Sequence, residues 1–166
     1  MKKPLPTAEH LRRVLSSGVL TECLTELPPR GATEAEMAEI DALVGRTLSE
    51  QHRSLLRVWN GANLDVVQFF ATSGDNSMRS YSRLQFPGVP GPAVPFAADP
   101  AGFVYLEAPD GQVWAWDHDG GGTEPVARDI HDFFCAYVFG PRAAEFGGVE
   151  WHDQLSSAGL VNERDA

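Results

Sequence analysis

The chain has 166 residues, of which 43% are hydrophobic and 22% are charged, and these values predict one globular domain and exclude a disordered chain. Thirteen basic and 23 acidic residues give a formal net charge of −10. This charge repels nucleic acid and anionic membranes, so neither is expected as a partner, whereas it suits a basic partner protein.

The first 30 residues are predicted to be a helical extension. Thr7 has the side chain of a helix cap, and apolar residues at helical spacing follow it as far as Ser17. Pro28, Pro29 and Gly31 then break the pattern. Residues 1–30 are therefore separated from the domain proper, which is expected to begin at residue 31.

Two helices open the predicted domain. Thr33 and Glu36 have the spacing of a capping box, in which a hydroxyl and a carboxylate each bind a free backbone N–H, and they predict a helix over 33–44. Thr47 and Glu50 repeat this spacing and predict a second helix. Asn60-Gly61 ends it, because both residues tolerate the left-handed backbone of a helix C-cap.

Extended segments fill the middle of the chain. The predicted strands are 66–70, 93–98, 103–107, 112–117 and 124–127, with a long loop at 72–92 that includes a short helix near 77–84. Pro92 and Pro95 place the strand 93–98 at a sheet edge. Pro109-Asp110-Gly111 joins 103–107 to 112–117 as a hairpin, since proline presets φ and glycine accepts a positive φ.

A helix over 129–139, capped by Asp129, closes the predicted domain of residues 31–140. Residues 141–166 are expected to be a C-terminal extension packed on this domain, with one short helix near 149–157. Strands grouped together with helices before and after them predict the α+β class, with a mostly antiparallel sheet and helices packed on one face.

Asp117-His118-Asp119 is the string that most resembles a metal site, with His131, Asp132, His152 and Asp153 further along the chain. Neighbouring residues of a strand point to opposite faces, so Asp117 and His118 do not enter one site while extended. Short polar side chains also suit the end of a strand before a glycine turn. This structural interpretation is preferred, and no metal or other cofactor is expected.

Nucleophilic catalysis has no signature here. The chain has no GxSxG motif, and Gly120, Gly121 and Gly122 lack the GK[ST] of a phosphate-binding loop. Cys135 lies in an apolar helix, where its thiol is inert, and with Cys23 it forms no metal or redox motif. No apolar stretch follows the charged N-terminus, so a cytoplasmic protein is expected.

Trp114 and Trp116 share one face of a predicted strand, and Val113 and Ala115 share the other. If the aliphatic pair faces the helices, the tryptophans stand on an open face, where aromatic residues often mark interaction sites. If the tryptophans face inward, they belong to the core. Core packing of at least one of them is favoured.

The order of these motifs resembles the SUKH superfamily of the Smi–Knr type. The resemblance covers residues 30–140. It rests on four strings in order, Trp59-Asn60-Gly61, Pro95-Phe96-Ala97-Ala98-Asp99 with Gly102, Trp116-Asp117-His118-Asp119, and the aromatic helix Asp129–Phe139. Ser49 stands where the family usually has a proline.

The resemblance implies a binding protein and not an enzyme. Bacterial members look like immunity proteins that bind a cognate toxin, often a nuclease. A protein partner is therefore expected at the open sheet face, with Trp114, Trp116, Asp117 and Asp119 as the contact residues. Two alternatives stay open: an intracellular scaffold or regulatory module without a toxin, and a small metal-dependent hydrolase that uses residues 117–119.

Overall fold

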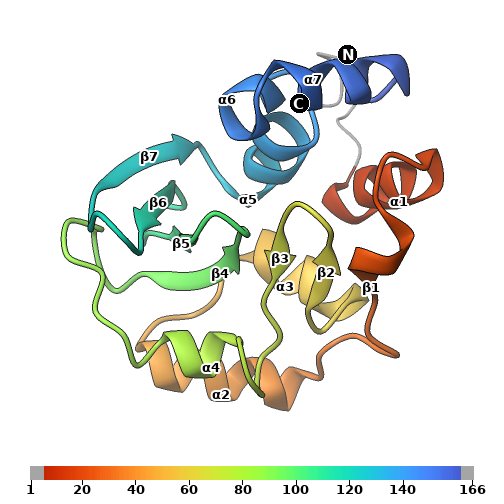
Figure 1. The fold of residues 1–166 in the computed structure, drawn as a ribbon. Coiled ribbons are helices and arrows are strands. Elements are labelled where there is room, and N and C mark those ends of the chain that lie inside the picture. Colours follow the sequence, from red (N-terminus) through yellow and green to blue (C-terminus); the bar gives the residue numbers. More distant parts are fainter. Residues whose placement is uncertain (1–5, 162–166) are drawn as a thin grey trace, which may run out of the picture.

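In the computed structural model, which describes residues 6–161, the strands form one antiparallel sheet in which each strand pairs with the next along the chain (Figure 1). The strands are β1 (Thr25–Glu26), β2 (Ala62–Leu64), β3 (Gln68–Phe69), β4 (Val94–Ala98), β5 (Phe103–Glu107), β6 (Val113–Asp117) and β7 (Thr123–Ala127). The predicted α+β class with an antiparallel sheet is confirmed.

Helices precede the sheet strands, lie between them and follow them along the chain. They are α1 (Thr7–Ser17), the short turn η1 (Glu22–Leu24), α2 (Glu34–Val44), α3 (Glu50–Val58), α4 (Met78–Tyr81), α5 (Ile130–Asp132), the π-helix η2 (Phe133–Val138), α6 (Ala143–Gly147) and α7 (Val149–Ser157). In Figure 1, α5, α6 and α7 lie above the sheet, and α2 lies beside α4 below β4.

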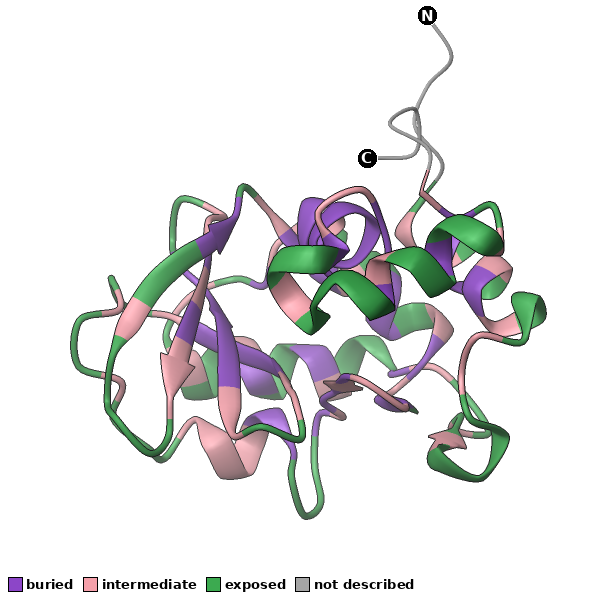
Figure 2. Cartoon of the chain, turned by 45° about the horizontal axis from the view of Figure 1, so that its top comes forward, coloured by how far each residue is buried: buried purple, intermediate pink, exposed green. Residues whose placement is uncertain are grey.

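The main core lies between the sheet and the segment α5–η2. The ring of Phe133 contacts Tyr105 of β5 at a centroid distance of 4.7 Å and Phe96 of β4 at 5.1 Å. Aromatic rings bury large apolar areas, and the contact with Phe96, which is edge-to-face, adds a favourable ring geometry. Figure 2 shows the buried residues gathered in the strand centres and in this helical segment.

Both terminal segments pack on η2 and its end. His10 of α1 bonds the carbonyl oxygen of Phe139 through Nε2 at 2.8 Å, and the indole N–H of Trp151 in α7 donates to the carbonyl oxygen of Val138 at 2.8 Å. These two buried bonds satisfy backbone carbonyls at the end of the helix, where no further turn donates an N–H to them.

The opposite face of the sheet carries α4 and the loop 82–92. Tyr81 stacks on Phe70 at 4.5 Å, and Phe86 lies edge-on against Trp116 at 5.2 Å. Because both faces of β4 and β5 are covered, Val104 and Leu106 are buried as well as Tyr105. These two strands therefore have nearly continuous buried runs.

The capping box predicted at Thr33 and Glu36 is confirmed, and the one predicted at Thr47 and Glu50 is wrong. The Thr33 hydroxyl accepts the N–H of Glu36, and the Glu36 carboxylate accepts the N–H of Thr33. The next helix begins two residues later than expected, because Ser49, not Thr47, accepts the N–H of His52. The Ser49 hydroxyl also donates to the buried Glu107 of β5, a contact that Thr47 does not make.

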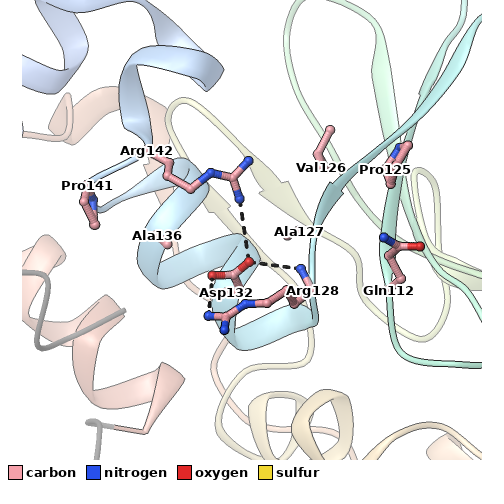
Figure 3. A pocket seen from close by; sticks show the side chains of 9 residues that line it. All are labelled: Gln112, Pro125, Val126, Ala127, Arg128, Asp132, Ala136, Pro141 and Arg142. Atoms are coloured by element: carbon pink, nitrogen blue, oxygen red, sulfur yellow. Dashed lines mark hydrogen bonds and ion pairs between the residues drawn. The ribbon is translucent and has the colours of Figure 1, made fainter.

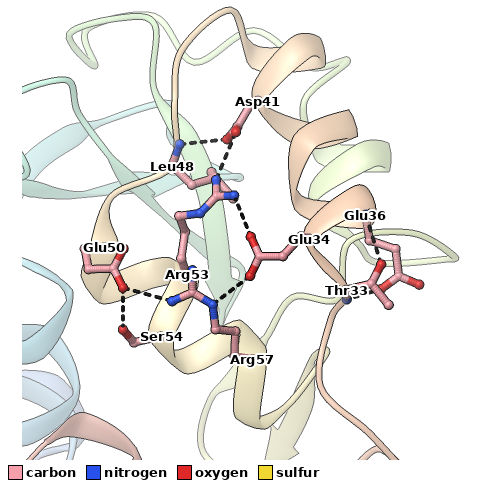
Figure 4. A network of polar contacts seen from close by, with 9 residues as sticks. All are labelled: Thr33, Glu34, Glu36, Asp41, Leu48, Glu50, Arg53, Ser54 and Arg57. Carbon is pink, nitrogen blue, oxygen red and sulfur yellow. Dashed lines mark hydrogen bonds and ion pairs between the residues drawn. The ribbon is translucent and has the colours of Figure 1, made fainter.

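The helices α2 and α3 are joined by a network of ion pairs (Figure 4). Arg53 donates to Asp41 at 2.9 Å and to Glu34 at 3.2 Å, and Arg57 donates to Glu34 and Glu50. The Asp41 carboxylate also accepts the N–H of Leu48, which fixes the connection between the two helices. The Arg57 pairs are exposed, and exposed pairs of this kind add little to stability, whereas Arg53 and Asp41 are largely buried.

The strand at 94–98 is central and not at an edge, which corrects the prediction from its prolines. It pairs with β3 on one side and β5 on the other. Its register with β5 shifts between Pro95 and Ala97, and such an irregularity is where a sheet tolerates a residue without an N–H. The missing hydrogen bond therefore falls where the ladder is already interrupted.

Three further details depart from the predictions. Thr7 is the first residue of α1 and not its cap, and its hydroxyl bonds Nδ1 of His131 instead. The strand predicted at 66–70 is present only as the two residues of β3, and β2 precedes it without having been predicted. The last helix is predicted correctly in position and in its Asp129 cap, but most of it is a π-helix.

Candidate partner-binding surface

The strand β6 holds three of the four residues predicted to contact a partner. Trp114 pairs with Leu106 of β5 and Trp116 pairs with Val104, so the two indoles lie on the face of the sheet that carries the loop 82–92. Asp117 pairs with Phe103 and lies on the other face. The structure therefore brings the tryptophans together and separates them from Asp117 by the thickness of the sheet.

Both tryptophans are half-buried. Phe86 covers one edge of Trp116, and Gly88 of the same loop lies close to the side chain of Thr123 in β7. The indole Nε1 atoms of Trp114 and Trp116 are shielded from solvent without a hydrogen-bond partner among the described residues. Unpaired buried donors of this kind carry a desolvation penalty.

Asp117 and Asp119 build the turn that follows β6. The Asp117 carboxylate accepts the N–H of Asp119 at 2.9 Å, and Nδ1 of His118 lies 3.0 Å from the Asp119 carboxylate. These contacts are those of a polar turn. Over residues 6–161, no group of three or more His, Cys, Asp or Glu side chains is placed to hold a metal ion.

The turn after β6 lies beside the turn between β4 and β5. The N–H of His118 donates to the carbonyl oxygen of Gly102 at 3.2 Å. Asp99 of the second turn accepts the Tyr105 hydroxyl at 2.6 Å, and burial, with the Asp99 carboxylate, raises the pKa of Tyr105. This end of the sheet, defined by Asp99, Asp117, Asp119 and Glu124, is called here the acidic strand end.

The residues of the acidic strand end come from a long stretch of sequence that has no Lys or Arg. Between Arg83 and Arg128 the sequence has no Lys or Arg and has six acidic residues. One of them, Glu107, is buried against Arg46 of the connection between α2 and α3. The other five therefore give the half of the sheet from β4 to β7 a negative field. The charge run is visible in the sequence, although only the fold shows that two of its turns are neighbours.

A cavity of about 420 Å³ lies between β7 and the last helical segment (Figure 3). Asp132 stands in it between two arginines, at 3.1 Å from Arg128 and 3.6 Å from Arg142. Burial opposes ionisation of Asp132, but the backbone N–H and guanidinium of Arg128, with Arg142, hold its pKa below the usual value. The carboxylate is thus occupied as an ion-pair partner, and Arg142 is shared with Glu145.

The side chain of Cys135 does not form a reactive site. It is fully buried in η2, and its Sγ lies 3.7 Å from Nδ1 of His131, which also bonds the Thr7 hydroxyl at 2.9 Å. Reactive thiols are partly exposed in electropositive surroundings, and this one is not. The arrangement joins α1 to the last helix.

None of the helices in residues 6–161 combines the length and the apolar character needed to cross a bilayer. A search of curated proteins found no match to the chain. A family model, described as the SMI1 / KNR4 family (SUKH-1), matches residues 31–136. This match covers well over half of the chain and confirms the resemblance inferred from its motifs, so the chain belongs to the SMI1 / KNR4 family (SUKH-1).

Proposed function

We propose that this chain is an immunity protein that acts without catalysis, by binding a cognate toxin of basic surface in the cytoplasm. The observation that carries the proposal is the acidic strand end on a domain of this family. A toxin that cleaves nucleic acid attracts phosphate with Lys and Arg. An acidic protein presents the same sign of charge as that substrate, and it covers the site by complementary electrostatics.

The face of the sheet that carries Trp114 and Trp116, called here the tryptophan face, supports a protein interface next to this charge. Trp114 and Trp116 are large and half-buried, and both carry unpaired indole N–H groups. Interfaces concentrate their binding energy in aromatic residues that are surrounded by polar ones. Asp117 and Asp119 lie at the end of the same strand, so a partner that covers the turn after β6 reaches the edge of the tryptophan face.

The experiment is inhibition of the toxin by the purified chain. The substrate turnover of the protein from the adjacent toxin gene is measured as this chain is added, for the wild type and for Asp117→Asn/Asp119→Asn. We expect stoichiometric inhibition by the wild type. The double variant is expected to bind about tenfold more weakly, because two negative charges of the turn that faces the partner are lost.

Glu150→Gln/Asp153→Asn is the matched control, since it removes the same charge from the exposed side of α7. It is expected to inhibit as the wild type does. If the toxin keeps full activity at saturating amounts of the wild-type chain, the immunity role is refuted for that pair. If both double variants weaken inhibition equally, net charge and not the acidic strand end determines binding.

A further inference from the structure

A hollow of about 290 Å³ lies between the C-terminal helices and the turn that joins β4 to β5. The turn forms one wall and α6 with α7 forms the other, and the residues that line these walls are Asp99, Pro100, Ala101, Phe146, Gly147 and Trp151. Apart from the Asp99 carboxylate the lining is apolar, and no Lys or Arg of residues 6–161 belongs to it. It is called here the hollow.

The helical wall of the hollow is aromatic. The Phe146 ring is half-buried, and its centroid lies 5.5 Å from that of Tyr137. Gly147 gives the Trp151 indole room at this wall, because a Cβ on Gly147 would lie 2.8 Å from Cδ1 of Trp151. Aromatic rings attract a guanidinium group, which is flat and stacks on them.

Carboxylates from three elements lie around this wall. Burial raises the pKa of the Tyr137 hydroxyl, and it is raised further by the negative charges of Glu124 in β7, Asp99 in the turn and Glu145 in α6. Arg142 opposes this effect, but its guanidinium is ion-paired with Glu145. The hollow therefore lies in a negative field, which attracts a cationic group.

The hollow adjoins the acidic strand end. Residues two apart in a strand share a face, so Phe103 lies on the same face as Tyr105, whose ring centroid is 6.3 Å from that of Phe146. Asp117 pairs with Phe103 and lies on that face too. The turn that follows Asp117 is hydrogen bonded to the turn at 99–102. A partner that covers the acidic strand end from this side therefore reaches the hollow.

We infer that the hollow takes one arginine side chain of the partner protein, with its guanidinium at Asp99 and its aliphatic stem against Pro100 and Phe146. The inference rests on the proposed basic toxin, and it names the side chain and the pocket by which that toxin is held. Arginine fits better than lysine, because a flat guanidinium stacks on an aromatic ring while its N–H groups bind a carboxylate.

The Asp99 carboxylate is held in place for this contact. It accepts the Tyr105 hydroxyl at 2.6 Å and the N–H groups of Ala101 and Phe103 at 2.9 and 3.1 Å. An ionised carboxylate has about four acceptor positions, so these three bonds leave one for a donor from outside. An acceptor fixed before binding loses little conformational freedom when the partner arrives.

A peptide titration tests the hollow without the toxin. The probe is acetyl-Gly-Arg-Gly-amide, added at low ionic strength to the full ¹⁵N-labelled chain, with NMR detection of the backbone amides and the tryptophan indole N–H groups. We expect the Trp151 indole signal and the Gly147 amide signal to shift, and the indole signals of Trp114 and Trp116 to stay in place. The peptide with citrulline instead of arginine keeps the shape and loses the charge, and it is expected to bind at least fivefold more weakly.

Two variants without a change of charge locate the site. Ala101→Leu fills the hollow from the exposed turn, and Ala38→Leu places the same side chain on the exposed side of α2. The first is expected to weaken the arginine peptide at least fivefold and the second less than twofold. Equal affinities of these two variants, equal binding of the citrulline peptide, or an unshifted Trp151 indole would overturn the inference.

The charge is tested by Asp99→Asn, which keeps the oxygen that accepts the two backbone N–H groups. It is expected to weaken the arginine peptide at least fivefold and to leave the weak binding of the citrulline peptide unchanged. Equal weakening of both peptides would mean that the variant acts through the shape of the turn, and it would overturn the role given to the Asp99 charge.

Inhibition of the toxin is then compared for the two leucine variants. Ala101→Leu is expected to inhibit at least tenfold more weakly than Ala38→Leu. If the wild type inhibits and both variants inhibit equally well, the immunity role stands and the hollow is not the contact. If the wild type does not inhibit, the immunity role fails for that pair, and the peptide titration alone decides whether the hollow binds arginine.

Discussion

His52 lies in the centre of the core with neither ring nitrogen hydrogen bonded to a described residue. Its ring packs edge-on against Phe69 and Phe96, at centroid distances of 5.8 and 5.9 Å. Desolvation by burial, with smaller effects of Arg46 and Arg53, lowers the pKa of His52 to about 3. The side chain is therefore an uncharged aromatic ring in the folded protein at neutral pH.

This burial makes the free energy of unfolding depend on pH. The folded-state pKa is below the unfolded value of 6.5, so the unfolded chain binds the proton first. The contribution of His52 to stability is fully present above pH 6.5 and declines as the pH falls toward 3, by up to about 1.4 kcal/mol per pH unit. Denaturant unfolding at pH 7 and at pH 5 checks this. The free energy of unfolding should fall less between these two pH values for His52→Leu than for the wild type.

His118→Leu is the control for this measurement, because His118 is exposed in the turn after β6. It is expected to keep the pH dependence of the wild type. At pH 7, His52→Leu should be at least as stable as the wild type, since it removes two buried nitrogen atoms that have no partner. An identical loss of stability in the two variants between pH 7 and pH 5 would contradict this account of His52.

At the scale of the elements, the start of α3 depends on one serine. Ser49 accepts the N–H of His52 and donates to the carboxylate of Glu107 at 2.6 Å. Glu107 is 1% exposed and is also paired with Arg46 at 3.1 Å. The cap therefore joins the helix to β5 through a buried carboxylate, for which each hydrogen bond reduces the penalty of burial.

Ser49→Ala removes both of these bonds and is expected to destabilise the protein by about 1–3 kcal/mol. Thr47→Ala, which changes the residue with the capping-box spacing in the sequence, should change the free energy of unfolding by less than about 0.5 kcal/mol. Thermal or urea denaturation of the two variants checks the difference. A larger effect of Thr47→Ala would mean that the helix begins where the sequence pattern alone places it.

These caps also show what the sequence can and cannot predict. Thr33 and Glu36 were predictable because a capping box is a contact between residues three apart. Ser49 was not preferred over Thr47 because its second partner, Glu107, is 58 positions away. The central place of β4 was missed for a related reason, since the shifted register that accommodates Pro95 depends on the pairing with β5. The π-helix keeps the apolar pattern of an α-helix, so the pattern does not separate the two.

The candidate surface, too, was predictable from the sequence only where it depends on local patterns. The shared face of Trp114 and Trp116 follows from the alternation of a strand, and the charge run follows from composition. The cover that Phe86 gives to Trp116, and the proximity of Asp99 to the turn at Asp117, come from long-range packing. Such packing leaves no local signal in one sequence.

At the scale of the whole molecule, the net charge of −10 should act mainly on the rate of association. Under the proposed function, long-range attraction steers the basic toxin toward the acidic strand end, and salt screens this attraction over about 10 Å at 0.1 M. The association rate constant for the toxin is expected to fall at least tenfold between about 10 and 150 mM salt, with a smaller change in the dissociation rate constant. Stopped-flow or surface-based kinetics measure both, and an association rate independent of salt would contradict the role given to charge.

The order of the strands has a consequence for how the protein is made. Every strand pairs with its successor, although α2 and α3 lie between β1 and β2 in the chain, and α4 lies between β3 and β4. The strands therefore leave the ribosome in the same order in which they lie side by side in the sheet. The docking partner of α1 around Phe139 is translated some 130 residues after His10. The core between the sheet and Phe133 is therefore complete only after the last helices have been translated.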